Sequence, residues 1–492
     1  MYKHLGVRKW LIGRLGEVRI HAALALVILI TFVLSQPRTT LVVGGILCFV
    51  TYGYLGFREA RKTPLWLSPL SFYFFWYCVG MGASPFYIGL ITSDDSVRFV
   101  SDSTMVPIAD LAAGYVVFLC GSLALHLGVQ IFRPISPSQE TEGLGKNFLK
   151  LLGAVWVVGL IFQINPSLFS FLGGTAKILA VALLGSVCGF AIVERQRMGL
   201  SRLGFFTILL LGTTGLFFGN LASDSKTYIM FSFLPLFWFF LIRRRLRVWV
   251  PPLALVLGLF YLATVAPVIQ TARMRPVEVG TSTREHLIET FDNWRRETPA
   301  EISGSFLGDQ LDRFFQRQFD AVPVGFLVGE VERSGLMLGE TMKYAGYAFV
   351  PRLIWPDKPT VTRGGWFSTY LGLYDVEAEA TTAIGMTAVG ELYWNFGILG
   401  VLIGMCLMGC GLGYLWSLAT ADPRAKPIHM LLYVTVMLAM PDMAEAVTIF
   451  VSLVVAFLTF KAAFFFMDVL SLVGRKTGAL TPTSPIRTRQ SS

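Results

Sequence analysis

The feature that most constrains this chain is a series of long apolar stretches separated by short polar gaps. A helix that crosses the hydrocarbon layer of a bilayer needs about 20 apolar residues, and lipid-facing backbone must be helical because nothing in the lipid satisfies its polar groups. Charged residues are only 15 % of the chain and the mean hydropathy is +0.62, against roughly 25 % charged residues in soluble domains. Twelve stretches are predicted to be membrane-spanning helices: 20–36, 38–56, 66–90, 107–132, 151–167, 170–193, 203–221, 227–242, 248–269, 398–418, 429–446 and 448–470.

The basic residues predict how these helices are oriented. If the N-terminus lies in the cytoplasm, the cytoplasmic segments hold 24 of the 41 lysines and arginines. The short outer segments hold only Arg38, Arg98, Lys177 and Lys226. This asymmetry is what the positive-inside rule describes, so both termini are predicted to be cytoplasmic. Orientation explains the net charge of +10, and it makes anionic membrane lipid, not nucleic acid, the implied partner.

The sequence therefore predicts an all-α polytopic membrane protein of about twelve transmembrane helices, N-in and C-in, with one large outer loop. The predicted regions are an N-terminal helix array over 1–270 (about nine helices), the loop over 271–385, three further helices over 386–473 and a tail over 474–492. The tail is rich in serine, threonine and proline and is predicted to be disordered. A loop as long as 271–385 is usually functional, so the search for chemistry starts there.

The loop has helical patterns of its own. Apolar residues recur at helical spacing over 284–297 and 309–331, which predicts amphipathic helices that lie on the membrane surface or pack over the helix bundle. Residues 340–350 are predicted to form a helix that stops at Pro351. The following segment, 351–359, contains three prolines and is predicted to be extended and rigid.

Basic residues near the outer face are the candidate anion binders. The candidates are Lys226, Arg273 and Arg275 at predicted helix ends, and Arg313, Arg317, Arg352 and Arg363 in the loop. Arginine forks bind phosphate in a bidentate manner. Because the loop holds 12 basic and 16 acidic residues, most of its charges are expected simply to be solvated. Arg352, between two prolines, and Arg273, at a membrane exit, are the stronger candidates.

The stretch 390–404, GELYWNFGILGVLIG, is the most informative. Glu391 stands at the entrance of an apolar helix and is followed by Tyr393, Trp394 and Asn395. Ionisable groups at membrane depth are costly and tend to be functional, so Glu391 is a candidate general base. The alternatives are a salt bridge from Glu391 to a loop arginine and an interfacial belt formed by the two aromatic residues. The glycines of the stretch predict close helix contact.

The cysteines point to no redox or metal chemistry. All six fall inside apolar stretches, and no spacing matches a metal site. Cys406 and Cys410, four residues apart, are predicted to be small residues at a helix contact.

An ordered set of motifs resembles the Wzy-type polymerases, which join oligosaccharide repeat units into O-antigen or exopolysaccharide. The motifs are SDSKTYIM at 223–230, TARMRP at 271–276, FVPRLIWPDKP at 349–359 and GELYWNFGILG at 390–400. They cover roughly residues 220–415; the first half of the chain matches only as a helix array. Lys226 stands where the family usually has a basic residue and many relatives carry arginine.

The resemblance implies a metal-independent GT-C type glycosyltransferase without a cofactor, working at the periplasmic face of the bacterial inner membrane. Its substrate would be an undecaprenyl-diphosphate-linked oligosaccharide, and a chain-length regulator protein is a further candidate partner. Under this hypothesis Lys226, Arg273, Arg352 and Arg363 bind the diphosphate and Glu391 activates the acceptor hydroxyl. Arg275, Arg313, Arg317, Tyr393 and Asn395 are the secondary candidates.

Three other functions remain open. A ligase of the same family would transfer a finished glycan to another acceptor, in one step and without a ladder of lengths. A flippase or transporter of lipid-linked sugar usually shows inverted repeats and polar groups at mid-membrane; the sequence shows no such repeat, and its polar residues are predicted to concentrate outside the bundle. A structural scaffold is the third alternative, and the arginine-rich loop argues against it.

Overall fold

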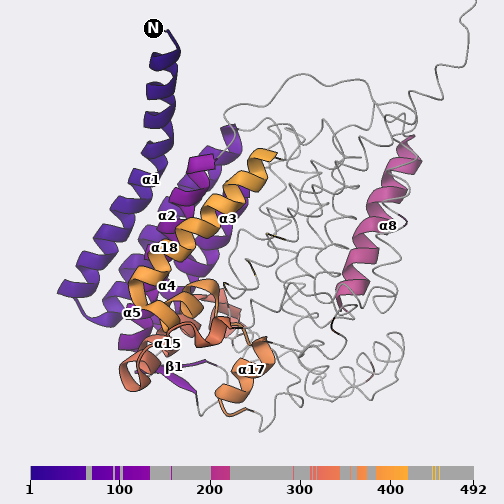
Figure 1. The fold of residues 1–492 in the computed structure, drawn as a ribbon. Coiled ribbons are helices and arrows are strands. Elements are labelled where there is room, and N and C mark those ends of the chain that lie inside the picture. The colour runs from indigo at the N-terminus through magenta and orange to yellow at the C-terminus, as the bar shows by residue number, and fades with distance from the viewer. Residues whose placement is uncertain are drawn as a thin grey trace, which may run out of the picture.

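The computed structural model of this chain describes eight continuous segments and several shorter pieces. The segments are residues 2–62, 69–91, 95–99, 104–132, 201–221, 318–343, 363–373 and 384–418, and the shorter pieces are 157, 292, 308, 311–312, 314–316, 355, 446, 449 and 454. Most of these residues are helical (Figure 1). The helical class predicted from the apolar stretches is therefore confirmed for the part of the chain that is described.

Long helices make up the N-terminal part. They are α1 (Tyr2–Leu34), α2 (Pro37–Lys62), α3 (Pro69–Tyr77), the π-helix η1 (Cys78–Ala83), α4 (Ser84–Ile91) and α5 (Ile108–Phe132). A short antiparallel hairpin of β1 (Ser96–Arg98) and β2 (Met105–Pro107) joins α4 to α5, with Val97 opposite Val106. The later described elements are α8 (Arg202–Leu221), α15 (Ala321–Ser334), the 3-10 helix η5 (Glu340–Met342), α17 (Arg363–Tyr370) and α18 (Ala388–Leu418).

Five helical stretches among the described residues are long and apolar enough to cross a membrane. They are Gly16–Leu34, Pro37–Glu59, Pro69–Ile91, Ile108–Phe132 and Ala388–Ser417. Four agree closely with the predicted stretches, whereas the fifth begins ten residues before the predicted start at 398. Helix α8 coincides with the predicted stretch 203–221. The other six predicted helices, the helix over 284–297 and the tail lie outside the described residues, apart from a few single positions.

The third apolar stretch is continuous but irregular, because Pro85 lies inside it. Proline has no N–H, so it cannot donate to the carbonyl four residues earlier, which belongs to Met81. The hydroxyl of Tyr115 on α5 donates to that carbonyl at 2.8 Å instead. The π-helix η1 directly precedes the proline turn, as expected where the regular ladder is interrupted. A side chain from α5 thus provides a donor for the carbonyl whose usual α-helical partner the proline removes.

Helices α5 and α18 pack with their backbones almost in contact. A Cβ atom on Gly128 would collide with the carbonyl of Cys406 and lie 2.8 Å from the amide nitrogen of Cys410. A Cβ on Gly409 would collide with the carbonyl of Leu125. This is the small-residue contact that was predicted for the two cysteines of α18, and it is the type of packing that holds apolar helices together in lipid.

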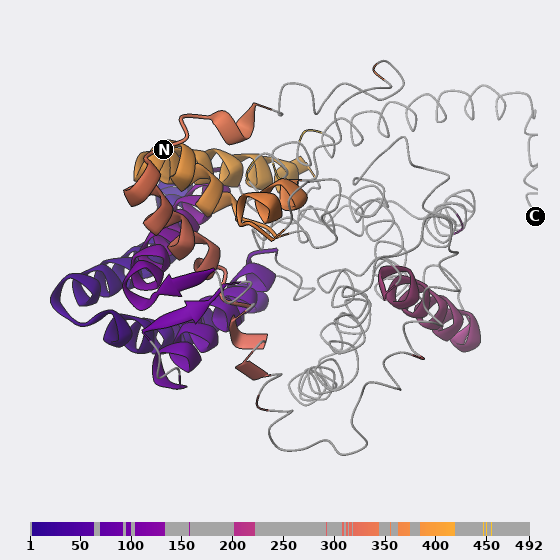
Figure 2. The same cartoon turned by 90° about the horizontal axis from the view of Figure 1, so that it is seen from below.

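The elements from the second half of the chain gather at one end of the N-terminal bundle. The β1–β2 hairpin, α15 and α17 lie at this end, where α5 and α18 begin (Figure 1), and the view from below shows α15 and the strands lying over the bundle (Figure 2). We call it the loop end. Helix α8 stands apart from the other described helices in both views. The loop end is where the candidate residues of the last third of the chain meet the apolar helices.

A chain of buried polar side chains crosses the contact between α1, α2 and α5 in the other half of the bundle. Its members are Glu17, His21, Tyr52, Ser122, His126 and Gln130, and each is at most 5 % exposed. The links are Gln130 Nε2 to Glu17 Oε2 at 3.4 Å, Gln130 Nε2 to His126 Nε2 at 3.0 Å, His126 Nδ1 to His21 Nδ1 at 3.3 Å, and Tyr52 OH to His21 Nε2 at 2.8 Å. We call this set the polar chain. Polar side chains thus also lie inside the described part of the bundle, linked to one another by hydrogen bonds.

Candidate functional site

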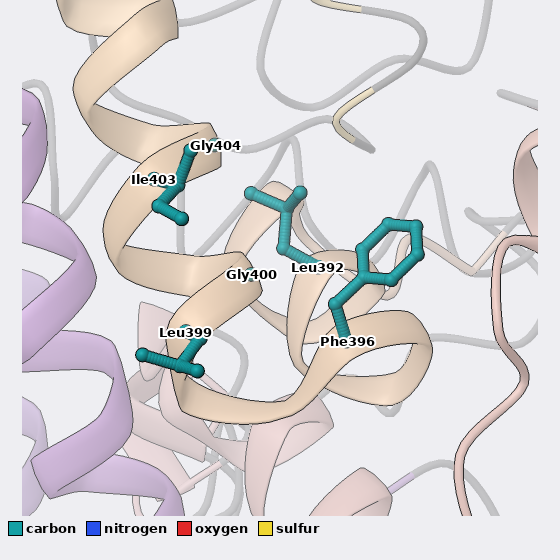
Figure 3. A pocket seen from close by; sticks show the side chains of 6 residues that line it. All are labelled: Leu392, Phe396, Leu399, Gly400, Ile403 and Gly404. Carbon is teal, nitrogen blue, oxygen red and sulfur yellow. The ribbon is translucent and has the colours of Figure 1, made fainter.

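Helix α18 is two helices joined at a sharp break. Gly397 has φ 65° and ψ −158°, a conformation that only glycine adopts without strain. The break separates a short first part, residues 388–396, from the long apolar part that follows. The close-up shows the two parts folded back beside each other (Figure 3). The glycines of the stretch 390–404 make the close helix contacts that were predicted: Gly390 lies against Leu327 of α15, and Gly400 and Gly404 lie against the first part of α18 itself.

A turn from the loop satisfies the groups that this break frees. The carbonyls of Trp394 and Asn395 accept hydrogen bonds from the backbone N–H of Met337, at 2.9 Å, and of Leu338, at 3.2 Å. The N–H of Gly339 donates to the side-chain oxygen of Asn395 at 2.9 Å. We call residues 337–342 the capping turn. It closes a helix end that would otherwise leave its last carbonyls without partners.

The capping turn also holds Glu391, which is completely buried. The hydroxyl of Thr341 donates to Glu391 Oε1 at 3.1 Å, and Asn395 Nδ2 donates to the Thr341 hydroxyl oxygen at 2.6 Å. Asn395 Nδ2 also lies 2.7 Å from the Glu391 carbonyl. Two candidates from the sequence, Glu391 and Asn395, are thus linked through a threonine that the sequence analysis did not single out.

The backbone around this carboxylate is unusual. Leu338 (φ 48°) and Thr387 (φ 61°) are the described non-glycine residues with positive φ, and both lie within a few residues of the site in space or in sequence. Such conformations cost of order 1–3 kcal/mol and tend to cluster at functional sites. The Thr387 hydroxyl accepts a hydrogen bond from the N–H of Gly390 at 3.2 Å, which caps the first turn of α18.

Aromatic side chains form a wall beside Glu391. Trp394, one helical turn later, has its ring centroid 4.9 Å from that of Tyr370, 6.0 Å from that of Trp366 and 6.0 Å from that of Phe367, all on α17. Trp394 is fully buried, so the interpretation of this tryptophan as part of an interfacial belt is wrong: it faces α17 instead. Tyr393, the other candidate aromatic, is half-buried against the main core.

An open apolar groove of about 330 Å³ lies between the two parts of α18. Its lining is Leu392, Phe396, Leu399, Gly400, Ile403 and Gly404 (Figure 3). A Cβ at Gly404 would lie 2.6 Å from Leu392 Cδ2, so a larger residue at this position would collide with the side chain of Leu392. Leu399 is 68 % exposed and Ile403 is 62 % exposed. Leu392, the residue after Glu391 in the chain, is part of this apolar lining.

The structure describes only some of the predicted anion binders. Lys226, Arg273, Arg275, Arg313, Arg317 and Arg352 lie outside the described residues. Arg363 is the first residue of α17, and its side chain is likewise not described. The backbone of α17 nevertheless contacts the segment that leads into α18. The N–H of Ile384 in that segment donates a hydrogen bond to the carbonyl of Gly364 at 3.3 Å. Arg363 therefore begins the helix that packs on Trp394.

Two features of the loop differ from the prediction. The helix predicted over 340–350 is, where described, only the 3-10 turn η5, because Thr341 and Gly339 are committed to hydrogen bonds with α18. The predicted amphipathic helix over 309–331 is interrupted at Phe319 and Asp320, and α15 starts afresh with Pro323 in its first turn, where proline is tolerated. For α17, the aromatic spacing of Trp366, Phe367 and Tyr370 was a signal that the sequence analysis missed.

Comparison with known proteins adds no relative. No protein-family model, no curated protein and no solved structure matches this chain. What the fold and composition define is a multi-pass α-helical membrane protein with five candidate spans among its described residues. Its function must therefore be argued from the residues at the loop end.

Proposed function

We propose that this protein is a glycosyltransferase that joins undecaprenyl-diphosphate-linked oligosaccharide repeat units into O-antigen or exopolysaccharide. In this proposal the loop end faces the periplasm, the chain crosses the inner membrane about twelve times, and Glu391 is the catalytic base. The observation that carries the proposal is the buried Glu391 carboxylate, which accepts a hydrogen bond from a hydroxyl at 3.1 Å and belongs to the short helix whose Leu392 and Phe396 line an apolar groove.

The contact between Thr341 and Glu391 suggests how an acceptor sugar would bind. A general base must lie within about 2.6–3.2 Å of the hydroxyl it deprotonates. Thr341 provides such a hydroxyl in the resting protein, and we infer that an acceptor hydroxyl takes its place on Glu391 Oε1. The capping turn is the element that would move, because it carries Thr341.

The proposed step transfers the growing glycan to the acceptor sugar. The acceptor hydroxyl gives its proton to Glu391 while its oxygen attacks the anomeric carbon of the glycan held on undecaprenyl diphosphate. The bond between that carbon and the diphosphate oxygen breaks, and its electron pair leaves with the diphosphate. The proton remains on the Glu391 carboxyl until it is released to water, and the product is a glycan longer by the transferred chain.

The leaving diphosphate needs positive charge and its lipid needs an apolar path. Arg273, Arg352, Arg363 and Lys226 are the residues proposed to stabilise the developing charge. The groove of α18 suits part of an isoprenoid chain, since its lining is entirely aliphatic, aromatic or glycine. Trp366 and Tyr370 stack with their centroids 5.9 Å apart, and such aromatic faces suit sugar rings.

The experiment is a lengthening assay with the purified full chain in liposomes. Lipid-linked single repeats, taken from cells that lack this protein, are added and the products are separated by length. We expect a ladder of lengths from the wild type and a strongly reduced ladder from Arg352→Ala. A ligase would instead cap another acceptor in one step. Unchanged single repeats, with wild-type protein that is folded and inserted, would contradict the proposal.

One observation favours a second candidate, a transporter of lipid-linked sugar. Buried histidines and acids inside a helix bundle often mark ion or proton pathways in pumps and transporters, and the polar chain contains His21, His126 and Glu17. A transporter would move the lipid-linked repeat across the liposome membrane without lengthening it. The same preparation tests both candidates, since translocation and lengthening give different products.

A further inference from the structure

The loop segment before α15 runs into the bundle alongside η1 and α4. Tyr87 on α4 donates its hydroxyl hydrogen to Asp312 at 2.5 Å and stacks on Phe315 with ring centroids 4.4 Å apart. Further along the segment, the carbonyl oxygen of Gln318 lies only 2.8 Å from where a Cβ of Gly80 would stand. As the segment runs from residue 312 to residue 318, its contacts shift from Tyr87 on α4 to Gly80 on η1. The segment therefore runs into the bundle, away from the loop end.

Helix α15 runs back toward the loop end along α5. The ring of Phe319 packs edge-on against Tyr115 at 5.6 Å. Gly325 then approaches Gly114 backbone to backbone, and a Cβ at Gly329 would lie 2.6 Å from the Asp110 carboxylate. The partners on α5 thus move from residue 115 to residue 110. Residues 311–334 form a hairpin inserted between η1–α4 and α5, with Phe319 and Asp320 at its tip.

The tip carries a carboxyl group deep inside the bundle. Asp320 is 7 % exposed, and its Oδ2 makes no hydrogen bond. This oxygen lies 3.6 Å from the Cβ position of Gly80, which is midway along the apolar stretch Pro69–Ile91. Non-helical backbone at such depth is tolerated only where protein surrounds it, so the tip depends on its fit to η1.

The described residues of the helices around the tip supply no cation to Asp320. The described residues of α3, η1, α4 and α5 contain no lysine or arginine. The titratable groups on these helices near the tip are Tyr77, Cys78, Tyr115 and, further out, Tyr87 with Asp312 of the hairpin itself. On α15 the charged Glu330, Glu332 and Arg333 lie at the opposite end of the helix. Burial raises the pKa of Asp320 to about 7.

One helix connects this tip to the candidate catalytic base. α15 begins directly after Asp320 and ends at Ser334, and the capping turn that holds Glu391 starts three residues later. α15 also packs against both α5 and α18. Movement of the tip would therefore be transmitted through α15 to the turn that carries Thr341.

We propose that Asp320 is a positioning residue: in its neutral form it docks the hairpin 311–334 into the bundle and so sets the capping turn over Glu391. The second half of this statement rests on the proposed function, whereas the docking does not. Docking of a carboxyl group whose pKa is raised by burial takes up a proton. Docking is therefore strongest below the usual pKa of 3.8, weakens up to about tenfold per pH unit as the pH rises to about 7, and stays constant above that.

Thiol labelling of the full chain in liposomes tests the docking. Val322→Cys places a probe at a position that is 2 % exposed in the docked hairpin, and Leu336→Cys, at a position 42 % exposed, gives the reference for the pH dependence of thiol chemistry. Labelling of the chain without either substitution gives the background from its native cysteines. We expect the ratio of the Val322→Cys rate to the Leu336→Cys rate to rise by up to about 50-fold from pH 5 to pH 7. In an Asp320→Asn background, which keeps the shape and removes the titration, the ratio should stay constant.

A ratio that does not change with pH in the Asp320 protein, or that rises equally in the Asp320→Asn background, overturns the proposal. The lengthening assay then tests the link to Glu391: the rate of Asp320→Asn relative to wild type should rise from pH 5 to pH 7, and a constant relative rate overturns the positioning role. If the wild type lengthens no glycan while the labelling behaves as expected, the proposed function fails and the docking stands.

Discussion

Two fully buried glutamates, Glu17 and Glu391, stand in different surroundings. Glu17 Oε1 lies 3.7 Å from Arg58 Nε, and the rest of its carboxylate faces Gln130 of the polar chain, between long helices. Glu391 lies in a short helix before a break, under a turn that contains a residue with positive φ, Leu338. An open apolar groove begins at the next residue, Leu392.

The two carboxylates are thus equally buried but differ in the groups that surround them. The polar chain is enclosed by α1, α2, α3 and α5, and its members are linked to one another by hydrogen bonds, as in a structural network. The Glu391 carboxylate instead contacts a short turn of the loop, through the Thr341 hydroxyl. We therefore expect changes in the polar chain to affect stability, and changes around Glu391 to affect glycan transfer.

The largest expected effect separates the two glutamates directly. Glu391→Gln should lower the lengthening rate by about 10²–10⁴-fold, because an amide cannot accept the proton of the acceptor hydroxyl. Glu17→Gln is the matched control and should leave the rate of correctly inserted protein unchanged. The opposite pattern, in which only Glu17→Gln abolishes glycan movement, would reverse the comparison and favour the transporter.

The second prediction concerns the stability of the polar chain. His126→Ala removes the partner of both His21 and Gln130 and should lower the free energy of unfolding by about 2–3 kcal/mol. Leu127→Ala, on the same helix at a position 39 % exposed, is the control and should cost less. Thermal unfolding in detergent measures both. Equal losses would show that the hydrogen bonds of the polar chain contribute little.

The third prediction tests the break in α18. Gly397→Ala forces a side chain into φ 65° and should cost about 1–3 kcal/mol, while also changing the groove and slowing lengthening. Gly372→Ala, at φ 71° after α17 with no atom near its Cβ position, should cost a similar amount of stability. If both variants lengthen glycan equally well, the groove has no part in transfer.

The smallest effects come from removing one hydroxyl in each region. Thr341→Val deletes the donor to Glu391, and Ser122→Ala deletes a donor to the Leu119 carbonyl at 2.9 Å. Each should cost about 1 kcal/mol of stability. Because the acceptor must displace the Thr341 hydroxyl, Thr341→Val should also lower the KM for acceptor by about fivefold. Ser122→Ala should leave that KM unchanged, and a raised KM in Thr341→Val would show that Thr341 helps to bind the acceptor.

Much of the described fold follows from periodicity and composition. The apolar stretches gave four of the five candidate spans to within a few residues, because a helix in lipid must be both long and apolar. The start of α18 was predicted ten residues too late, since Glu391 and Asn395 look like the end of a polar loop. In the structure they lie inside the helix because Thr341 and the capping turn satisfy them.

The candidate site was only partly predictable. Glu391 and Asn395 were found because charged and amide groups are rare next to an apolar run. Thr341 and Trp366 were missed, since a threonine in a loop and an aromatic pair give no local signal of a partner far away in sequence. Asp320 was one of 16 acidic residues of the loop, and nothing in its neighbours indicated that it would be buried.

Hydropathy and length along the chain were enough to predict a membrane protein and the position of its described helices, because both act locally. Only the tertiary structure decided that the loop enters the bundle as a hairpin, that two histidines meet inside it and that a threonine covers Glu391. These outcomes depend on contacts between residues 50 to more than 200 positions apart, and the free energy of such contacts is set by packing and burial, which no local pattern encodes.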